Sequence, residues 1–562
     1  MSKVFNRVGR VRPRRNMFNL SYRKNFTCNM GQLVPVMCDE VVPGDFFKIG
    51  NQLTVRFQPL AAPIMHEISA TVHYFFVPTR LIWDLWEDFI SNGENPVPYT
   101  LPRMPRPPQP QLKGSLWDYF GFPISQSQAP DPQPTSGATP LVFPWYAYNF
   151  IMREYYLDEE IDSHVIQELE QHPSSNKVQY RRWSKDYFTS ARISRQRGQT
   201  PALPVNVGDF RFDSTGFEPR DYVALNQLFP RDSFGVAVIP SFTRVLQNGA
   251  SVGSGDPFSP QTQGVKVNSP DTAPVGSLSQ GTDVVDVGRK LVKGLGASAT
   301  TFNVSDLRLA FQVQKWLERN SRAGIRYTSF LQSHFGVSPS DARLDRPEYI
   351  GGTKCPIQIS EVLQTSQTTE GSGGSPLGEF AGHGLAADSH YAGSYNVQEF
   401  GYIIGIMSVM PKPAYQDGIN RQWLRRMPTD FYFPEFAHLS EQGIYNAEVF
   451  AARDESSDYA VWGFAGQYDE MRVKHDMVCG DMRRYSESNP QLSYWNLTRK
   501  FYQLPPLNTT FISTEGQIRE DIFLVQSLPN QPLDHLIVNC QNIIQAVRPL
   551  PLIAEPGLID HF

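Results

Sequence analysis

A dense group of basic side chains opens the sequence, and such groups bind phosphates. Eight basic residues and no acid occur in the first 24 positions: Lys3, Arg7, Arg10, Arg12, Arg14, Arg15, Arg23 and Lys24. The whole chain has a formal net charge of −5, so the residues after this group sum to −13. Arginine and lysine displace counterions from nucleic-acid phosphates, and the interleaved Phe5, Phe18 and Tyr22 could stack on unpaired bases. We therefore predict a DNA-binding arm over residues 1–30.

Three other interpretations of the arm remain open. A targeting peptide fits poorly, because serine is scarce and Pro13 interrupts any amphipathic helix. The run "RPRR" is weakly typical of a nuclear localisation signal. The arm could also be a solvated tail without a ligand.

Two glycine motifs resemble catalytic loops but lack the required context. "GASVG" (249–253) matches the nucleophile elbow of hydrolases, yet neither a strand nor a helix is predicted beside it. "GLGASA" (294–299) resembles a dinucleotide loop, but the next helix is predicted only near Ser305, too far away to hold a pyrophosphate. We interpret the first as a chance match and the second as a turn.

Metal and redox motifs are equally weak. His66 and His73 are seven residues apart, as are His383 and His390, which matches no tight zinc motif. The carboxylates of Asp84, Glu87 and Asp88 most simply form a solvated helix face, although a calcium role stays open. The five cysteines show no short repeated spacing, which disfavours a disulfide framework. We expect no catalytic residues, no metal, no cofactor and no enzymatic activity.

The elements that would position the basic arm are mainly strands. Apolar and polar residues alternate at 53–58 and 68–76, which predicts two half-buried strands, and a further strand is expected at 402–410. One helix is predicted at 81–90, and others at 145–156, 157–171 and 305–320. No hydrophobic signal peptide follows the basic start, and the longest apolar run is too short to span a bilayer. We therefore expect a soluble protein made in a cytoplasm.

Long connections separate these elements. Residues 95–144 contain 13 prolines, which favours extended backbone. Residues 247–282 are rich in Gly, Ser, Pro and Thr and carry only three charged side chains, as expected of a surface excursion, and the composition of 371–393 predicts a Gly-rich loop. The predicted organisation is an arm at 1–30, first strands and a helix at 31–90, a Pro-rich and helical insertion at 91–204, a protrusion at 205–300, a helix and loop insertion at 301–400, and the remaining strands with a C-terminal extension at 401–562.

Several ordered blocks resemble one family. "SHFGVSPSDARLDRPEYIGG" (333–352) closely resembles the major capsid protein of gokushoviruses, single-stranded DNA phages of the microvirus family. "CDEVVPGDFF" (38–47), "YFFVPTRLIWDLWEDF" (74–89), "DLRLAFQVQKWLERNSRAGIRY" (306–327) and the terminal "PGLIDHF" (556–562) continue the similarity in the family's order. It fades at 95–145 and 205–300.

The resemblance implies an eight-stranded antiparallel jelly-roll barrel with large insertions. Sixty copies would form a T=1 icosahedral shell around circular single-stranded DNA, with contacts at five-, three- and two-fold axes. Further implied partners are a small basic DNA-packaging protein, an internal scaffolding protein, a minor pilot protein and a host surface receptor. The protein would reside in the virion after assembly in the cytoplasm of a host bacterium.

The same resemblance implies a protrusion for host attachment. Residues 205–300 are the candidate, with Asp256, Phe258, Lys266 and Asp271 as possible receptor contacts. Sixty arms would supply about 480 charges, too few for a kilobase-scale genome at one charge per phosphate, which agrees with a separate packaging protein. The alternatives are a jelly-roll attachment or carbohydrate-binding protein, and a glycan-cleaving enzyme with two carboxylates about 5–10 Å apart.

Overall fold

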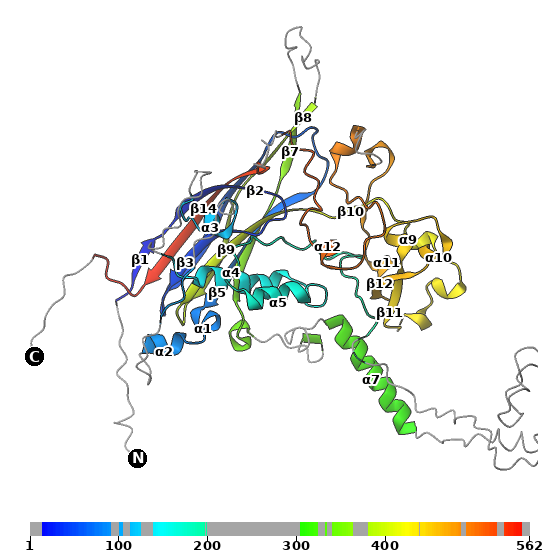
Figure 1. Ribbon diagram of the computed structural model, residues 1–562, viewed down its shortest axis with the longest axis horizontal. Helices are drawn as coiled ribbons and strands as arrows, with labels where there is room; N and C mark the ends of the chain where they lie inside the picture. Colours follow the sequence, from blue (N-terminus) through cyan, green and yellow to red (C-terminus); the bar gives the residue numbers. More distant parts are fainter. Residues whose placement is uncertain are drawn as a thin grey trace, which may run out of the picture. The chain divides into compact units, whose positions relative to one another are not determined.

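The computed structural model describes most of the chain in segments (Figure 1). These are residues 14–91, 100–104, 113–124, 139–196, 198, 304–323, 332–333, 340–363, 380–437, 439–484, 491–524 and 533–553. The chain divides into one unit of Met1–Gly198 with Leu317–Phe562 and a second of Gln199–Trp316. All the described residues belong to the first unit, apart from the N-terminal part of one helix.

Two antiparallel sheets form the centre of the first unit. The larger has the order β1-β14-β4-β8-β7, with β2 also paired to β14, and the smaller has the order β3-β9-β5-β6. Their bounds are β1 Asn16–Asn19, β2 Tyr22–Cys28, β3 Val34–Val41, β4 Phe46–Phe57, β5 Ile68–Pro78, β6 Glu348–Pro356, β7 Gln358–Leu363, β8 Phe380–Asn396, β9 Gly401–Pro411 and β14 Leu536–Arg548. In Figure 1, β14 (red) lies along the blue N-terminal strands, so the two ends of the chain share one sheet.

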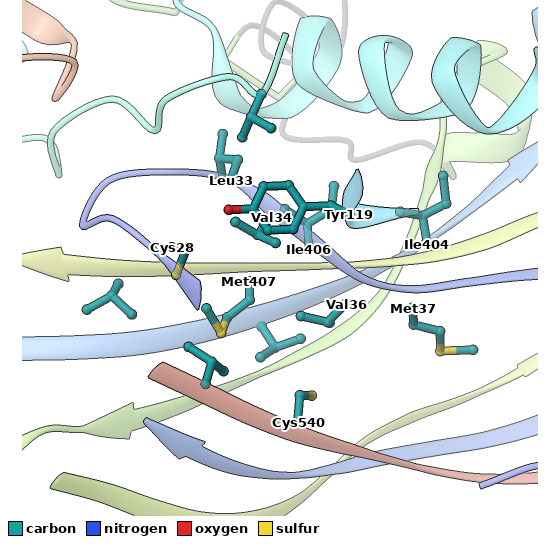
Figure 2. Packing of buried hydrophobic residues seen from close by; sticks show 14 of the residues in the cluster. Cys28, Leu33, Val34, Val36, Met37, Tyr119, Ile404, Ile406, Met407 and Cys540 are labelled. Atoms are coloured by element: carbon teal, nitrogen blue, oxygen red, sulfur yellow. The ribbon is translucent and has the colours of Figure 1, made fainter. Parts of the chain in front are cut away.

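Apolar side chains from both sheets make up the main core. Figure 2 shows Val36, Met37, Ile404, Met407 and Cys540 packed with other members of this cluster. The core also contains polar links. Asn51 on β4 and Asn542 on β14 lie opposite each other and are almost fully buried; Asn51 Nδ2 donates to Thr353 Oγ1 at 3.0 Å and Asn542 Nδ2 to the Val36 carbonyl at 3.0 Å. Each asparagine therefore ties the larger sheet to the smaller one.

The expected eight-stranded jelly-roll barrel is not formed as one closed sheet by the described residues. Their two large sheets are antiparallel and separate, and neither closes on itself; two further sheets, β10-β13 and β11-β12, have two strands each. Buried side chains, together with the two asparagine links, join the sheets where a barrel would have continuous backbone pairing. The mainly β class is confirmed, whereas an eight-stranded barrel is not.

The strands predicted by alternation are present. In β4, Leu53, Val55 and Phe57 are buried while Arg56 is exposed, as the pattern indicated. β5 is covered more completely than a half-buried strand, because Thr71 and Phe75 on its other face are buried too. The segment at 402–410 forms most of β9.

The Gly-rich segment 371–393 was predicted as a loop, which is wrong from residue 380 onward. There β8 pairs with β7 from Phe380 to Leu385 and with β4 from Leu385 to Asn396. Small side chains let the sheets approach: a Cβ on Gly351 of β6 would meet the Ala392 carbonyl of β8 at 2.1 Å, and one on Gly393 of β8 would meet the Ile350 carbonyl of β6 at 2.8 Å. Glycine is therefore required here for close packing, and it gives this strand a composition that resembles that of a loop.

The helix predicted at 81–90 is two short helices. These are α1 Thr79–Ile82 and α2 Trp86–Ser91, separated by the extended backbone of Trp83. The Trp83 ring packs on Phe89 and on Phe143 of α4, with ring centroids 5.6 and 5.8 Å apart. This aromatic packing accompanies the break in the helix that the periodicity predicted as continuous.

Of the remaining helices, the first lies inside the Pro-rich segment 95–144, which was predicted to be extended, and the others agree broadly with the predictions. They are α3 Leu116–Tyr119, α4 Phe143–Ile151 with the π-helical turn η1 Met152–Tyr156, α5 Ser163–Gln171 and α7 Val304–Ala323. No helix among the described residues is both long and apolar enough to cross a membrane.

A second, smaller core lies in a subdomain that we call the satellite (residues 414–524). Its bounded elements are β10 Ala414–Tyr415, β11 Glu441–Tyr445, α9 Asn446–Val449, α10 Glu455–Asp458, β12 Val461–Gly466, α11 Asp469–Arg472, β13 Asp476–Met477, α12 Thr509–Ile512 and the 3-10 turns η7 Arg421–Trp423, η8 Pro428–Asp430, η9 Pro434–Phe436, η10 Gly480–Met482 and η11 Gln491–Trp495; η6 Asp341–Leu344 precedes β6. Its core includes Tyr415, Phe501 and Phe511, which are buried together with Phe188 from an earlier part of the chain.

Candidate nucleic-acid interface

The predicted arm is partly built into the larger sheet. Within residues 1–30, β1 and β2 both pair antiparallel with β14, so the chain from Asn16 onward is sheet. Sequence reasoning missed these strands because "NMFN" and "YRKNFTC" do not alternate clearly. Arg14 and Arg15 are exposed immediately before β1. Lys3, Arg7, Arg10 and Arg12 lie outside the described residues.

Arg23 and Lys24 on β2 have opposite environments. Arg23 is exposed, and its Nε donates to Gln541 Oε1 on β14 at 3.3 Å. The Lys24 ammonium instead donates to the carbonyls of Pro35 (2.7 Å) and Tyr119, and burial lowers its pKa to about 8. Its surroundings give no support to a DNA-binding role for Lys24, since its donors are engaged within the protein.

The strand register places further cations beside Arg23. Gln541 lies between Arg23 on β2 and Gln52 on β4, while the exposed Lys48 and Arg56 lie on the same side of β4 as Gln52. We call this side the outer face of the larger sheet. Its residues on β2, β4 and β14 include Arg23, Asn25, Thr27, Lys48, Gln52, Thr54, Arg56, Ile537, Asn539, Gln541, Ile543 and Gln545, and none of these is a carboxylate. The carboxylate of Asp534, just before β14, accepts a hydrogen bond from the Thr27 hydroxyl.

Such a face suits an anionic polymer. Guanidinium and ammonium groups attract phosphates, and side-chain amides both donate and accept hydrogen bonds. The exposed Ile537 and Ile543 offer apolar contact to bases. The sequence held a signal for this surface: Arg56 and Lys48 follow the same period of two, but only pairing with β14 shows that they share a face with Arg23.

A cavity of about 700 Å³ lies elsewhere, on the smaller sheet. It is lined by Glu67, Ser69, Thr71, His73, Arg181, Ser184, Tyr349, Gly352, Thr353, Lys354, Met410, Pro411 and Lys412. Glu67 is the one carboxylate among these described lining residues, so the cavity lacks the pair that glycosidic cleavage requires. Arg181 Nη1 donates to Thr71 Oγ1 at 2.5 Å and to Ser408 Oγ at 2.8 Å.

His73 is partly buried in the wall of this cavity. Its Nδ1 lies 2.8 Å from the Tyr156 hydroxyl, and the two rings stack. Burial, assisted by the positive Arg181, lowers the pKa of His73 to about 4. The imidazole is therefore neutral at physiological pH.

The other sequence candidates are dispersed. Asp84, Glu87 and Asp88 are exposed on or beside α2. Within the described segments, no three His, Cys, Asp or Glu side chains are grouped closely enough to hold a metal ion. All five cysteines are free thiols, and Cys28, Cys355 and Cys540 are buried. Asp256, Phe258, Lys266 and Asp271 lie outside the described residues.

Known proteins match the chain over nearly its full length. The family described as "Capsid protein (F protein)" matches residues 7–558. "Capsid protein VP1" of Chlamydia phage 1 is 32% identical over 607 residues, covering 99% of this chain and 98% of the relative. Proteins of the same name are 29% identical in Bdellovibrio phage phiMH2K (99% and 98% covered) and 26% in Spiroplasma virus 4 (97% and 95%). The chain therefore belongs to this capsid protein family and is a structural protein rather than an enzyme.

Proposed function

We propose that this protein is the major subunit of a T=1 icosahedral shell in which sixty copies enclose circular single-stranded DNA. The observation that carries the DNA-binding part is the outer face of the larger sheet, where Arg23, Lys48 and Arg56 occur among amides and hydroxyls and the carboxylate of Asp534 reaches the face at Thr27. The arm begins at the edge of the same sheet, since β1 pairs with β14. Arm and outer face together would line the inside of the shell.

The fold supports a jelly roll as the shell-forming element. Eight strands make two sets of four, β14-β4-β8-β7 and β3-β9-β5-β6, and β1 and β2 extend the first set. Jelly rolls pack two such sheets face to face. The full-length relatives named as phage capsid proteins support the same interpretation.

The test of DNA binding is a salt series with single-stranded DNA. Replacing Arg7, Arg10, Arg12, Arg14 and Arg15 by Gln should lower the slope of log affinity against log salt by up to about 0.7 per lost contact, or about 3.5 in total. The loss should be equal for two unrelated oligonucleotides, because phosphate contacts carry no sequence information. Arg23→Gln with Arg56→Gln should lower the slope further.

A control variant separates phosphate contacts from general charge. Arg472 is an exposed arginine of the satellite, so Arg472→Gln should leave the slope unchanged. If the five arm substitutions also left it unchanged, the arm would not hold the genome. Lys24 is omitted from the set because its ammonium bonds to backbone carbonyls.

Host attachment is proposed for the protrusion at 205–300, including Asp256, Phe258, Lys266 and Asp271. Deletion within 247–282 should leave shells intact and reduce binding to host cells. A deletion that blocked assembly while subunits stayed folded would refute this assignment. The other proposed partners are a small basic packaging protein, an internal scaffolding protein and a minor pilot protein, which would meet the subunit in the host bacterial cytoplasm.

A further inference from the structure

The satellite segment from η7 to β11 carries six exposed large apolar side chains, four of which are aromatic. Trp423 is 74% exposed, and Met427, Phe431, Tyr432, Phe433 and Leu439 are each between 44% and 58% exposed. We call these six residues the aromatic patch. Isolated exposed apolar side chains are common, but six large ones within 17 residues of sequence are a different observation.

The segment that carries the patch is held in place by its own polar groups. Asp430 Oδ2 accepts hydrogen bonds from the backbone amides of Arg426 (2.8 Å) and Met427 (2.9 Å), which fixes the turn η8. The Tyr468 hydroxyl donates to the Phe431 carbonyl at 3.2 Å, and the Tyr432 and Tyr468 rings meet edge to face. The aromatic side chains are therefore presented by a fixed backbone, which reduces the entropy lost on binding.

The arginines beside the patch are already paired with carboxylates of the same subunit. Arg421 pairs with Glu448 (2.8 Å), Arg425 with Glu470 (3.8 Å) and Arg426 with Glu455. The Arg425 guanidinium also lies over the Phe431 ring, 5.2 Å from its centroid. A nucleic acid would need unpaired cations, so the patch is suited to an apolar protein surface instead.

The size and composition of the patch fit a contact between proteins. An aromatic side chain buries about 150–250 Å² when fully covered, so the six side chains leave on the order of 600 Å² to be buried. One partner of a standard interface contributes roughly 800 Å². Trp, Tyr, Phe, Met and Arg are also the residues enriched at interface centres.

We propose that the aromatic patch binds a second copy of this chain and forms one of the contacts between subunits of the shell. The inference rests on the proposed function, because a shell of sixty copies requires each subunit to cover surface on its neighbours. It names the surface that does so, which neither the family match nor the relatives' names specify.

The first experiment compares particle assembly of the purified full chain with and without the Trp423 side chain, the most exposed member of the patch. Trp423→Ala should leave thermal denaturation unchanged, since the side chain is mostly exposed, but should reduce the yield of particles in sedimentation at least tenfold. Tyr391→Ala on β8 is the matched control, because Tyr391 is an exposed aromatic residue (65%) outside the patch. Equal loss of particles in both variants, or normal particles from Trp423→Ala, would overturn the proposal.

The second experiment identifies the occupant directly. Trp423→p-benzoylphenylalanine, irradiated in assembled particles, should give a cross-linked band at twice the subunit mass. A cross-link confined to one chain would mean that the patch is covered by its own polypeptide. Particles that form normally but lose host binding would mean that it is a host contact, and either result refutes the proposal. If the unaltered protein formed no particles at all, the proposed shell function itself would fail.

Discussion

The sandwich of two sheets and the satellite are stabilised in different ways. In the sandwich, long strands bury alternate apolar side chains, as in β4 with Leu53, Val55 and Phe57. In the satellite, short elements surround charged and aromatic groups. Arg499 is 3% exposed there, donates through Nη2 to the Phe511 carbonyl at 2.6 Å and lies 4.3 Å from the centroid of the Phe511 ring.

This difference teaches where each region is sensitive. Apolar burial is non-directional, so a sandwich strand tolerates changes that keep volume and polarity. A buried arginine depends on specific partners, and losing one leaves groups without hydrogen bonds. We therefore expect substitutions that insert a charge to destabilise the sandwich most, and substitutions that remove a buried charge to destabilise the satellite most.

The largest effect is expected from a charge placed in the sandwich. Val55→Asp would bury a carboxylate without a partner at a cost of several kcal/mol, enough to prevent folding. Arg56→Gln, one residue further on the exposed side, should change stability by less than about 0.5 kcal/mol. Soluble yield and urea denaturation measure both variants; similar behaviour of the two would contradict the register of β4.

In the satellite, Arg499→Ala should unfold one region selectively. It removes the bond to the Phe511 carbonyl and the ring contacts, at an expected cost of about 3 kcal/mol. Hydrogen exchange should accelerate at Phe501 and Phe511 while the amides of β4 and β5 remain protected. Uniform acceleration over both regions would show that the satellite and the sandwich unfold as one unit.

A smaller loss is expected at the polar link inside the sandwich. Asn542→Ala leaves the buried Val36 carbonyl without its donor and should lower the free energy of unfolding by about 1–3 kcal/mol. The neighbouring Gln541→Ala, on the outer face, serves as its control and should have little effect. If Asn542→Ala were equally mild, the link between the sheets would contribute nothing to stability.

The smallest effect should be a pH-dependent gain. Burial raises the pKa of Asp39 on β3 to about 6, against an ordinary value of 3.8. The folded state therefore binds a proton more tightly than the unfolded chain, and stability falls as pH rises from about 4 to 6. Asp39→Asn should match the unaltered protein at pH 4 and exceed it above pH 6, by about 1 kcal/mol after solvent screening. Thermal denaturation at both pH values measures the difference; an advantage at low pH would reverse the sign.

The same contrast explains what the sequence could predict. Alternation at 53–58 and 68–76 identified β4 and β5, because a strand with one buried face shows a period of two. The glycine-rich composition of β8, where two backbones approach closely, hid that strand. The helical period joined α1 to α2, although the helix is interrupted at Trp83, whose ring packs on Phe143. Of the basic site, the arm was visible as an acid-free run. The environment of Lys24 depends on the carbonyls of Pro35 and Tyr119, and the outer face depends on pairing between residues about 500 positions apart.

The pairing of β1 with the end of β14 also sets a geometric limit on the arm. Asn16 lies opposite Arg548, and its side chain donates to the Leu550 carbonyl at 2.7 Å. The six basic residues from Lys3 to Arg15 lie within thirteen residues of Asn16, so each can lie at most about 45 Å from this anchor, at roughly 3.3–3.6 Å per residue. The segment before Asn16 is thus a short tether, which confines six positive charges to a sphere around one point of the sheet. Inserting ten residues between Arg15 and Asn16 would enlarge the radius of that sphere by up to about 35 Å. The same six charges would then be spread over a several-fold larger volume.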